Sequence, residues 1–120
     1  MSIEHYGRLE VPYDDAGRWD GLLVRYYPAP FEDKIYQLCT YVADIRHGEY
    51  KDFHTNGQLW EHMWFKNGIR HGEYYKYLFN GDVNKATLYY AGVDLNIDPR
   101  GLSEKDKLYV MMSGRLPPRD

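Results

Sequence analysis

Ile45-Arg46-His47-Gly48-Glu49-Tyr50 occurs twice in this chain, because residues 69–74 repeat the same six residue types in the same order. The two copies are 69 − 45 = 24 residues apart. An internal match at a period between about 20 and 50 residues indicates a repeat architecture, in which each unit packs against its neighbours along the chain.

Turn residues follow the same period. Asn56-Gly57 recurs as Asn80-Gly81, and each pair lies between two segments rich in aromatic and branched residues. Asn-Gly in this setting predicts a β-hairpin, since a type I′ turn requires positive φ at both central positions. Each unit is therefore expected to contain a strand, an Asn-Gly turn, a second strand and a further turn such as Asn67-Gly68.

The segment from Asn67 to Tyr74, followed by a strand and Asn80-Gly81, resembles the MORN repeat. It is most similar to a bacterial variant found in proteins labelled antitoxin-like, whose units read Tyr-x-Asn-Gly-x-x-x-Gly-Glu-Tyr. The resemblance is strong over residues 45–93 and degenerate before them. It implies a ladder of β-hairpins in a family that is mostly non-catalytic and makes protein or membrane contacts.

The expected fold is mainly β: a single domain over residues 1–120 built as an antiparallel β-hairpin repeat meander with a C-terminal capping helix. Residues 1–45 form degenerate units, residues 46–93 form the clear units, and residues 94–120 form a helical cap and tail. A chain of 120 residues is large enough for one modest core but not for two.

The capping helix is predicted from its end signals. Ser103 with Asp106 three residues later is an N-cap pattern, and Gly114 is a stop signal, so the helix should run over residues 104–113. Its expected apolar stripe consists of Leu102, Leu108, Met111 and Met112.

Composition argues against several classes of partner and predicts a cytoplasmic protein. The formal net charge of −3 argues against nucleic acid and against an anionic membrane surface as main partners. The single Cys39 cannot form an internal disulfide, which favours a reducing compartment. The first residues lack the basic and apolar blocks of a signal peptide, and no apolar run approaches about 20 residues, so no membrane insertion is expected.

No catalytic, metal or cofactor site is expected, and the protein is not predicted to be an enzyme. His47 and His71 are equivalent repeat positions about 9.6 Å apart, which is too far for a shared ligand set, and no cluster of carboxylates or thiols completes one. Glu49 and Glu73 recur with the scaffold, as solvated positions do. Cys39 has the neighbours of a packed strand residue rather than those of a nucleophile.

Two departures from the repeat indicate where a partner could bind. Trp60 and Trp64 have no counterpart in the neighbouring units, and residues 28–33 are an insertion that carries Phe31 at its tip. Pairing across the Asn56-Gly57 turn is expected to place Trp60 opposite Phe53, with His62 and Trp64 on the same face. The predicted partner-binding residues are Phe31, Phe53, Trp60, His62, Trp64 and Tyr75.

The sequence therefore predicts a non-catalytic protein-binding module, an inhibitor or antitoxin-like neutraliser of a bacterial or phage-related target. The alternative is a small-molecule or glycan binder, or an enzyme, that uses the aromatic sheet face. A thin sheet offers flat area more readily than the concave pocket that a small ligand prefers. Two apolar faces with one short helix also predict either a homodimer or a surface that a partner protein covers.

Overall fold

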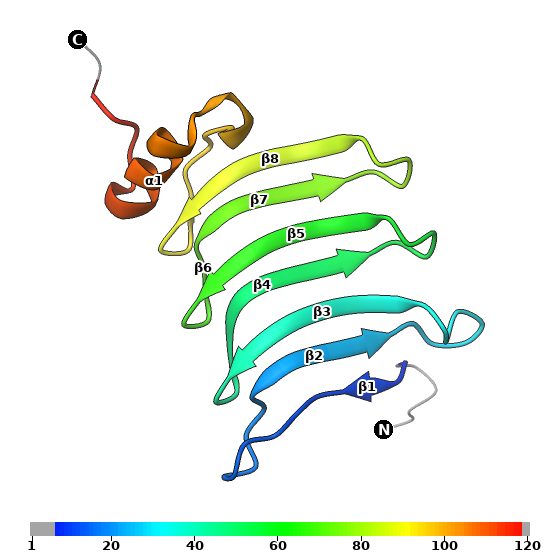
Figure 1. Cartoon of the computed structure of the whole chain (residues 1–120). Helices are drawn as coiled ribbons and strands as arrows, with labels where there is room; N and C mark the ends of the chain where they lie inside the picture. The colour runs from blue at the N-terminus through cyan, green and yellow to red at the C-terminus, as the bar shows by residue number, and fades with distance from the viewer. Residues whose placement is uncertain (1–6, 119–120) are drawn as a thin grey trace.

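A computed structural model describes residues 7–118, which form one antiparallel sheet of nine strands followed by a short helix. The sheet is a meander in which consecutive strands pair, and β6 is a short extension that pairs with β5 (Figure 1). The hairpin meander and the C-terminal helix predicted from the sequence are confirmed. The strands are β1 (Leu9–Glu10), β2 (Gly21–Tyr26), β3 (Ile35–Val42), β4 (Ile45–Phe53), β5 (Leu59–Lys66), β6 (Ile69–Arg70), β7 (Gly72–Tyr77), β8 (Val83–Tyr90) and β9 (Val93–Asp94).

The turns along one edge of the sheet recur every 24 residues and have the geometry expected of type I′. Asn67 and Gly68 both have positive φ, 51° and 85°, as the sequence predicted. The same two-residue turn is made by Ala43-Asp44 and by Ala91-Gly92. Positive φ at both positions is therefore a property of the repeat, even where alanine occupies the first position.

The Asn56-Gly57 turn at the opposite edge differs from the predicted type I′ geometry. Only Gly57 has positive φ, 87°, and its N–H donates to the carbonyl of His54 at 2.9 Å. Asn56 uses its side chain instead, accepting from the Gln58 N–H at 3.0 Å and donating to the Phe79 carbonyl at 2.8 Å. Asparagine thus links its own turn to that of the next hairpin.

A β-bulge follows each of these turns and corrects the predicted register. Asp52 pairs with Glu61, but Phe53 pairs with Leu59, so Trp60 has no cross-strand partner. The prediction that Phe53 faces Trp60 is therefore wrong, because one residue is inserted in β5 at this point. The equivalent residues Tyr36 and Asn84 are skipped in the same way.

The two faces of the sheet carry different residues. The face that holds most of the core is called the arginine face: Tyr41, Arg46, Tyr50, Met63, Phe65, Arg70, Tyr74 and Tyr89. The opposite face is called the tryptophan face: Glu49, Lys51, His62, Trp64 and Tyr75. Met63, Phe65, Tyr74 and Tyr89 form one buried cluster, and Leu23, Cys39 and Tyr41 form another.

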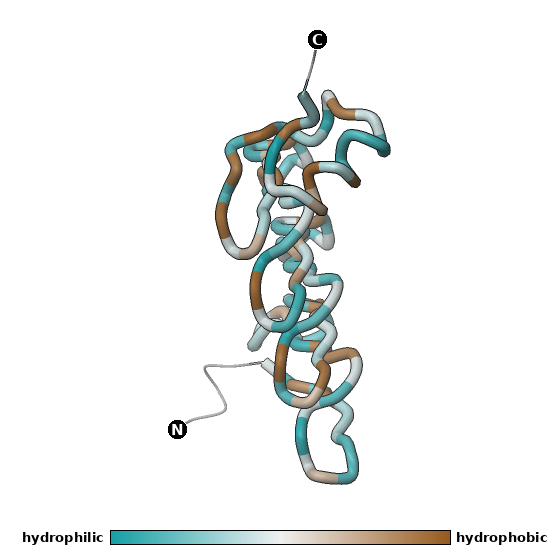
Figure 2. The backbone as a smooth tube through the Cα atoms, turned by 90° about the vertical axis from the view of Figure 1, so that its left-hand side faces the viewer, coloured by the Kyte–Doolittle hydropathy of each residue, from teal (hydrophilic) through white to brown (hydrophobic). Residues whose placement is uncertain are grey.

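Within residues 7–118, no second layer covers the sheet along most of its length, as the edge-on view shows (Figure 2). The Cα radius of gyration is 16.7 Å, whereas a compact domain of this length has a value of about 13.6 Å. Long side chains therefore complete the cover: the guanidinium of Arg46 lies 5.5 Å from the ring centres of both Tyr50 and Phe65.

The C-terminal helix α1 (Glu104–Ser113) has the bounds that the sequence predicted. The Ser103 hydroxyl accepts from the Asp106 N–H at 3.1 Å, and Gly114 ends the helix in the left-handed conformation. A short 3₁₀ turn, η2 (Pro99–Gly101), precedes it.

The predicted apolar stripe of α1 is wrong in part: Leu102 and Met111 are partly buried, but Leu108 and Met112 are exposed. Val110 is fully buried, whereas Leu108 and Met112 are 61% and 74% exposed. The side of α1 that carries Lys107 and Val110 packs on the sheet instead. Lys107 makes an ion pair with Glu73 at 3.4 Å, and Gly114 lies against the ring of Tyr90. The helix thus packs on the end of the tryptophan face formed by β7 and β8.

Candidate functional site

Trp64 lies near the centre of the tryptophan face and keeps 40% of its surface exposed. Its ring is tilted against the imidazole of His62, with ring centres 5.8 Å apart. His62 Nε2 lies 2.7 Å from Glu49 Oε2, and the ammonium of Lys51 lies 3.5 Å from the same oxygen. The polar groups beside Trp64 therefore contact one another: Glu49 contacts both His62 and Lys51. The indole ring next to them stays partly exposed.

Tyr75 lies beside His62 in the neighbouring strand and joins the same surface. Its hydroxyl donates to Glu73 at 2.7 Å and its ring stacks on Tyr77 at 6.2 Å. Burial, together with the bond to Glu73, raises the pKa of the Tyr75 hydroxyl. Because Glu73 also binds Lys107 of α1, the helix forms the wall that bounds this surface on one side.

Trp60 belongs to a different group, at the edge of the sheet where the bulge places it. Its ring stacks on His54 with centres 5.4 Å apart and planes at 25°. His54 also meets the edge of Phe79, which is 57% exposed, and its Nε2 lies 3.0 Å from the Tyr77 carbonyl. Trp60 therefore continues a row of aromatic side chains that follows the turns rather than the strand centres.

Phe31 and Phe53 also lie towards this turn edge. Phe31 is 41% exposed and meets Tyr27 edge to face at 6.4 Å, while the Tyr27 hydroxyl donates to the Phe53 carbonyl at 2.6 Å. The structure thus brings His62, Trp64 and Tyr75 together as one group. It places Phe31 and Trp60 with the turns, where the Phe53 carbonyl accepts the Tyr27 hydroxyl.

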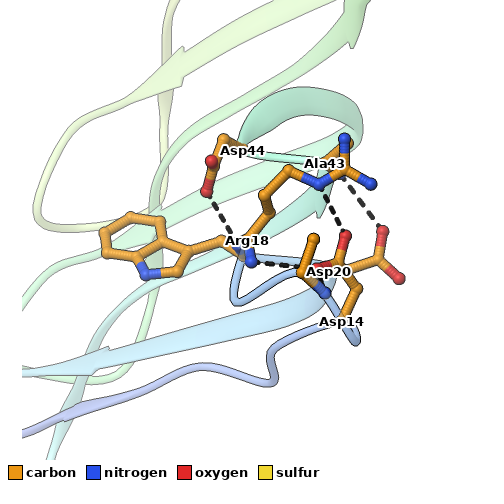
Figure 3. A network of polar contacts seen from close by, with 7 residues as sticks. Asp14, Arg18, Asp20, Ala43 and Asp44 are labelled. Carbon is orange, nitrogen blue, oxygen red and sulfur yellow. Dashed lines mark hydrogen bonds and ion pairs between the residues drawn. The ribbon is translucent and has the colours of Figure 1, made fainter.

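The three aspartates near the first turns have structural partners (Figure 3). Asp14 accepts the backbone N–H of Arg18 at 2.9 Å and its Nε at 2.9 Å, and these bonds, led by the backbone one, lower the pKa of the Asp14 carboxyl. Asp20 accepts the Ala43 N–H at 3.2 Å, and Asp44 accepts the Trp19 N–H at 2.7 Å. These carboxylates hold the first two turns together.

The histidines of the repeated hexapeptide have a matching role. His47 Nδ1 accepts the Asn67 N–H at 3.1 Å, and His71 Nδ1 accepts the Ala91 N–H at 3.2 Å. Asp20 makes the equivalent contact to Ala43 in the first unit. The side chain at this repeat position therefore accepts a hydrogen bond from the next type I′ turn along the edge. This role accounts for the recurrence of histidine in the hexapeptide.

Sequence reasoning did not single out the arginines of the same hexapeptide. Arg46 and Arg70 are both exposed on the arginine face, where each lies over aromatic rings. Their recurrence 24 residues apart was visible in the sequence. Their common face could be identified only once the pairing of Tyr41 with Arg46 and of Phe65 with Arg70 was known.

Other chemistry has little support among the described residues. Cys39 is 1% exposed and burial raises the pKa of its thiol to about 11, so it is protonated at neutral pH. Residues 7–118 contain no group of three or more His, Cys, Asp or Glu side chains placed to hold a metal ion. Within that same range, no helix combines the length and apolar content that crossing a bilayer requires.

Two hollows lie away from the predicted site. One, of about 280 Å³, is lined by the turn residues Lys66, Asn67, Ile69, His71, Tyr90 and Ala91. The other, of about 250 Å³, lies between the outer side of α1 and Pro117. Comparison of the sequence with protein-family models gave no matching family, and comparison with curated proteins gave no match.

Proposed function

We propose that this chain is a non-catalytic protein-binding module and that the tryptophan face is its contact surface. The observation that carries the proposal is the partly exposed indole of Trp64 in the middle of a sheet face whose charged groups are paired locally. Exposed tryptophan rings that a partner can desolvate are typical anchors of protein interfaces.

The shape of this surface supports a protein partner over a small ligand. Small molecules are usually held in concave sites that enclose most of their surface. His62, Trp64 and Tyr75 lie on one face of an extended sheet, bounded on one side by α1. A glycan or small-molecule binder therefore remains the second choice.

The finer part of the proposal is an inhibitor or antitoxin-like neutraliser of a bacterial or phage-related protein, acting in the cytoplasm. It is supported by the resemblance of residues 45–93 to MORN units of that kind and by the lone buried Cys39. The nine-strand hairpin meander fits the same resemblance. A second copy of the chain could cover the face in the absence of the target.

The proposal is tested by affinity capture from the native host with purified wild-type protein and with Trp64→Ala and Tyr75→Ala variants, which truncate two rings of the tryptophan face. We expect one partner to bind the wild type and to be lost or weakened with each variant, while Met112→Ala, an exposed change on the outer side of α1, retains it. The purified partner should then lose its own activity when the wild-type chain is added. Equal capture by all four proteins would overturn the assignment of this face.

A further inference from the structure

Arg46 and Arg70 form a pair of equivalent, exposed guanidinium groups on the arginine face. They occupy the same position in successive hairpins, so their backbones are separated by two strand spacings, or about 9.6 Å. The first unit has Trp19 near this position, packed edge to face on Tyr41 at 5.2 Å, and the last unit has Asp94. The two central units alone therefore present arginine.

Neither arginine has a carboxylate partner within residues 7–118. Arg46 Nε donates to the Tyr41 hydroxyl at 3.3 Å, and Arg70 donates to the Tyr89 hydroxyl at 3.4 Å. By contrast, Arg18 and Arg100 each make a close ion pair with an aspartate. A guanidinium carries five N–H donors in a planar fork, so most of the donors of Arg46 and Arg70 face outward without a protein acceptor.

The aromatic floor holds both groups in place. Arg46 lies over Tyr50 and Phe65 at 5.5 Å from each ring centre, and Arg70 lies over Tyr89 at 5.4 Å. Stacking of this kind limits the conformations of a long side chain, which lowers the entropy that binding must remove. Arginine on tyrosine is also a composition enriched at interface hot spots.

We propose that Arg46 and Arg70 bind an acidic segment of a protein through two carboxylates about 10 Å apart. A helix presents such a pair at positions i and i + 7, about 10.5 Å apart, and each guanidinium fork matches one carboxylate in two parallel hydrogen bonds. This surface lies on the face opposite Trp64, so it is independent of the function proposed above.

Charges on the same face favour a carboxylate pair over a nucleic-acid strand. Asp52, Glu61 and Asp94 lie on this face among the basic residues. A continuous polyphosphate would pass close to these carboxylates, whereas two carboxylates on a protein segment need to meet only the arginines. The chain as a whole also carries a net charge of −3, which weakens long-range attraction of a polyanion.

The test is selection of binders from a random dodecapeptide display library on the immobilised, full-length protein. Peptides that bind the wild type should be enriched in paired Asp and Glu residues. The dissociation constant of the best synthetic peptide should rise about tenfold or more for Arg46→Gln/Arg70→Gln. It should rise less for Arg46→Lys/Arg70→Lys, which keeps the charge but removes the fork.

The matched control is Lys34→Gln/Lys105→Gln, which removes the same charge from two exposed sites away from this face and should leave peptide binding unchanged. Far-UV circular dichroism and thermal unfolding of the glutamine variant separate loss of binding from loss of fold. The proposal is overturned if the selected peptides lack acidic pairs or if the control weakens them equally. Arginine-dependent binding of oligothymidylate without binding of acidic peptides would overturn it in favour of nucleic acid.

Discussion

His71 Nδ1 accepts the backbone N–H of Ala91 across 3.2 Å, a contact that joins one hairpin to the turn of the next. The bond requires a lone pair at this atom, so the residue at position 71 must offer a hydrogen-bond acceptor there. His71→Ala should leave the Ala91 N–H without this partner. His71→Asn should keep an acceptor in nearly the same place, as Asp20 does for Ala43.

We therefore expect His71→Ala to be less stable than His71→Asn by about 1 kcal/mol in urea unfolding. Both variants lose the ring contact with Tyr90, so the comparison isolates the acceptor. Equal stability of the two variants would show that the hydrogen bond contributes nothing measurable.

Gly72 should not tolerate alanine. Its φ of +116° lies in a region that residues with a Cβ strongly disfavour. Space is not the limit, because a new Cβ would lie 3.5 Å from the Trp64 Cβ, in ordinary van der Waals contact. We expect Gly72→Ala to lose about 1–3 kcal/mol of unfolding free energy. Gly101→Ala is the control, because it has no such φ and nothing within 4 Å of a new Cβ, and it should change stability by less than about 0.5 kcal/mol.

Asp52 predicts a pH dependence of stability. The residue is 4% exposed, and burial raises the pKa of its carboxyl above the ordinary 3.8, although Gln37 and Tyr50 donate to it and oppose the rise. A raised pKa in the folded state means that Asp52 favours folding most when protonated, and that this contribution is lost as the pH rises through the folded-state pKa. Asp52→Asn cannot ionise.

The unfolding free energy of Asp52→Asn should therefore improve relative to wild type as the pH rises from below 3.8 to neutral. Urea titrations of both proteins at several pH values measure this difference. A difference that is constant with pH, or that moves in favour of wild type, would contradict the raised pKa.

Leu88 and Trp64 share the tryptophan face but should respond differently to truncation. Leu88 is fully buried, so Leu88→Ala leaves a closed cavity and should cost about 2–5 kcal/mol. Trp64→Ala opens space that water can fill, since the ring is 40% exposed, and should cost less. Thermal and urea unfolding compare the two, and a larger loss for Trp64→Ala would identify the ring as core rather than contact surface.

The repeat predicted most of the backbone because its signals are local. The Asn67-Gly68 turn and the helix from Ser103 to Gly114 depend on residues that are adjacent in sequence, and both formed where expected. The bulge at Trp60 was missed because one extra residue between two strands can be absorbed by the turn or by the strand, and the pattern of side chains does not distinguish these cases.

Tertiary packing decided what the sequence left open. The helix carries apolar residues on several sides, so its own pattern did not show that Val110 would be buried and Leu108 exposed. The structure also separates the predicted site residues into two groups, because the bulge could not be recognised in the sequence. His62, Trp64 and Tyr75 follow strand alternation, which is readable in sequence, whereas the bulge moves Trp60 to the turn edge beside His54.

The meander has a mechanical consequence. β1 and α1 lie at opposite ends of the sheet, and each hairpin pairs only with its neighbours (Figure 1). A pulling force applied across these ends acts along the hydrogen bonds between strands. It therefore separates the strand pairs one after another. Each unit of 24 residues would release about 80 Å of chain as it opens. The protein should therefore lengthen in repeated small steps at low force, as an extensible tether does, rather than break in a single event.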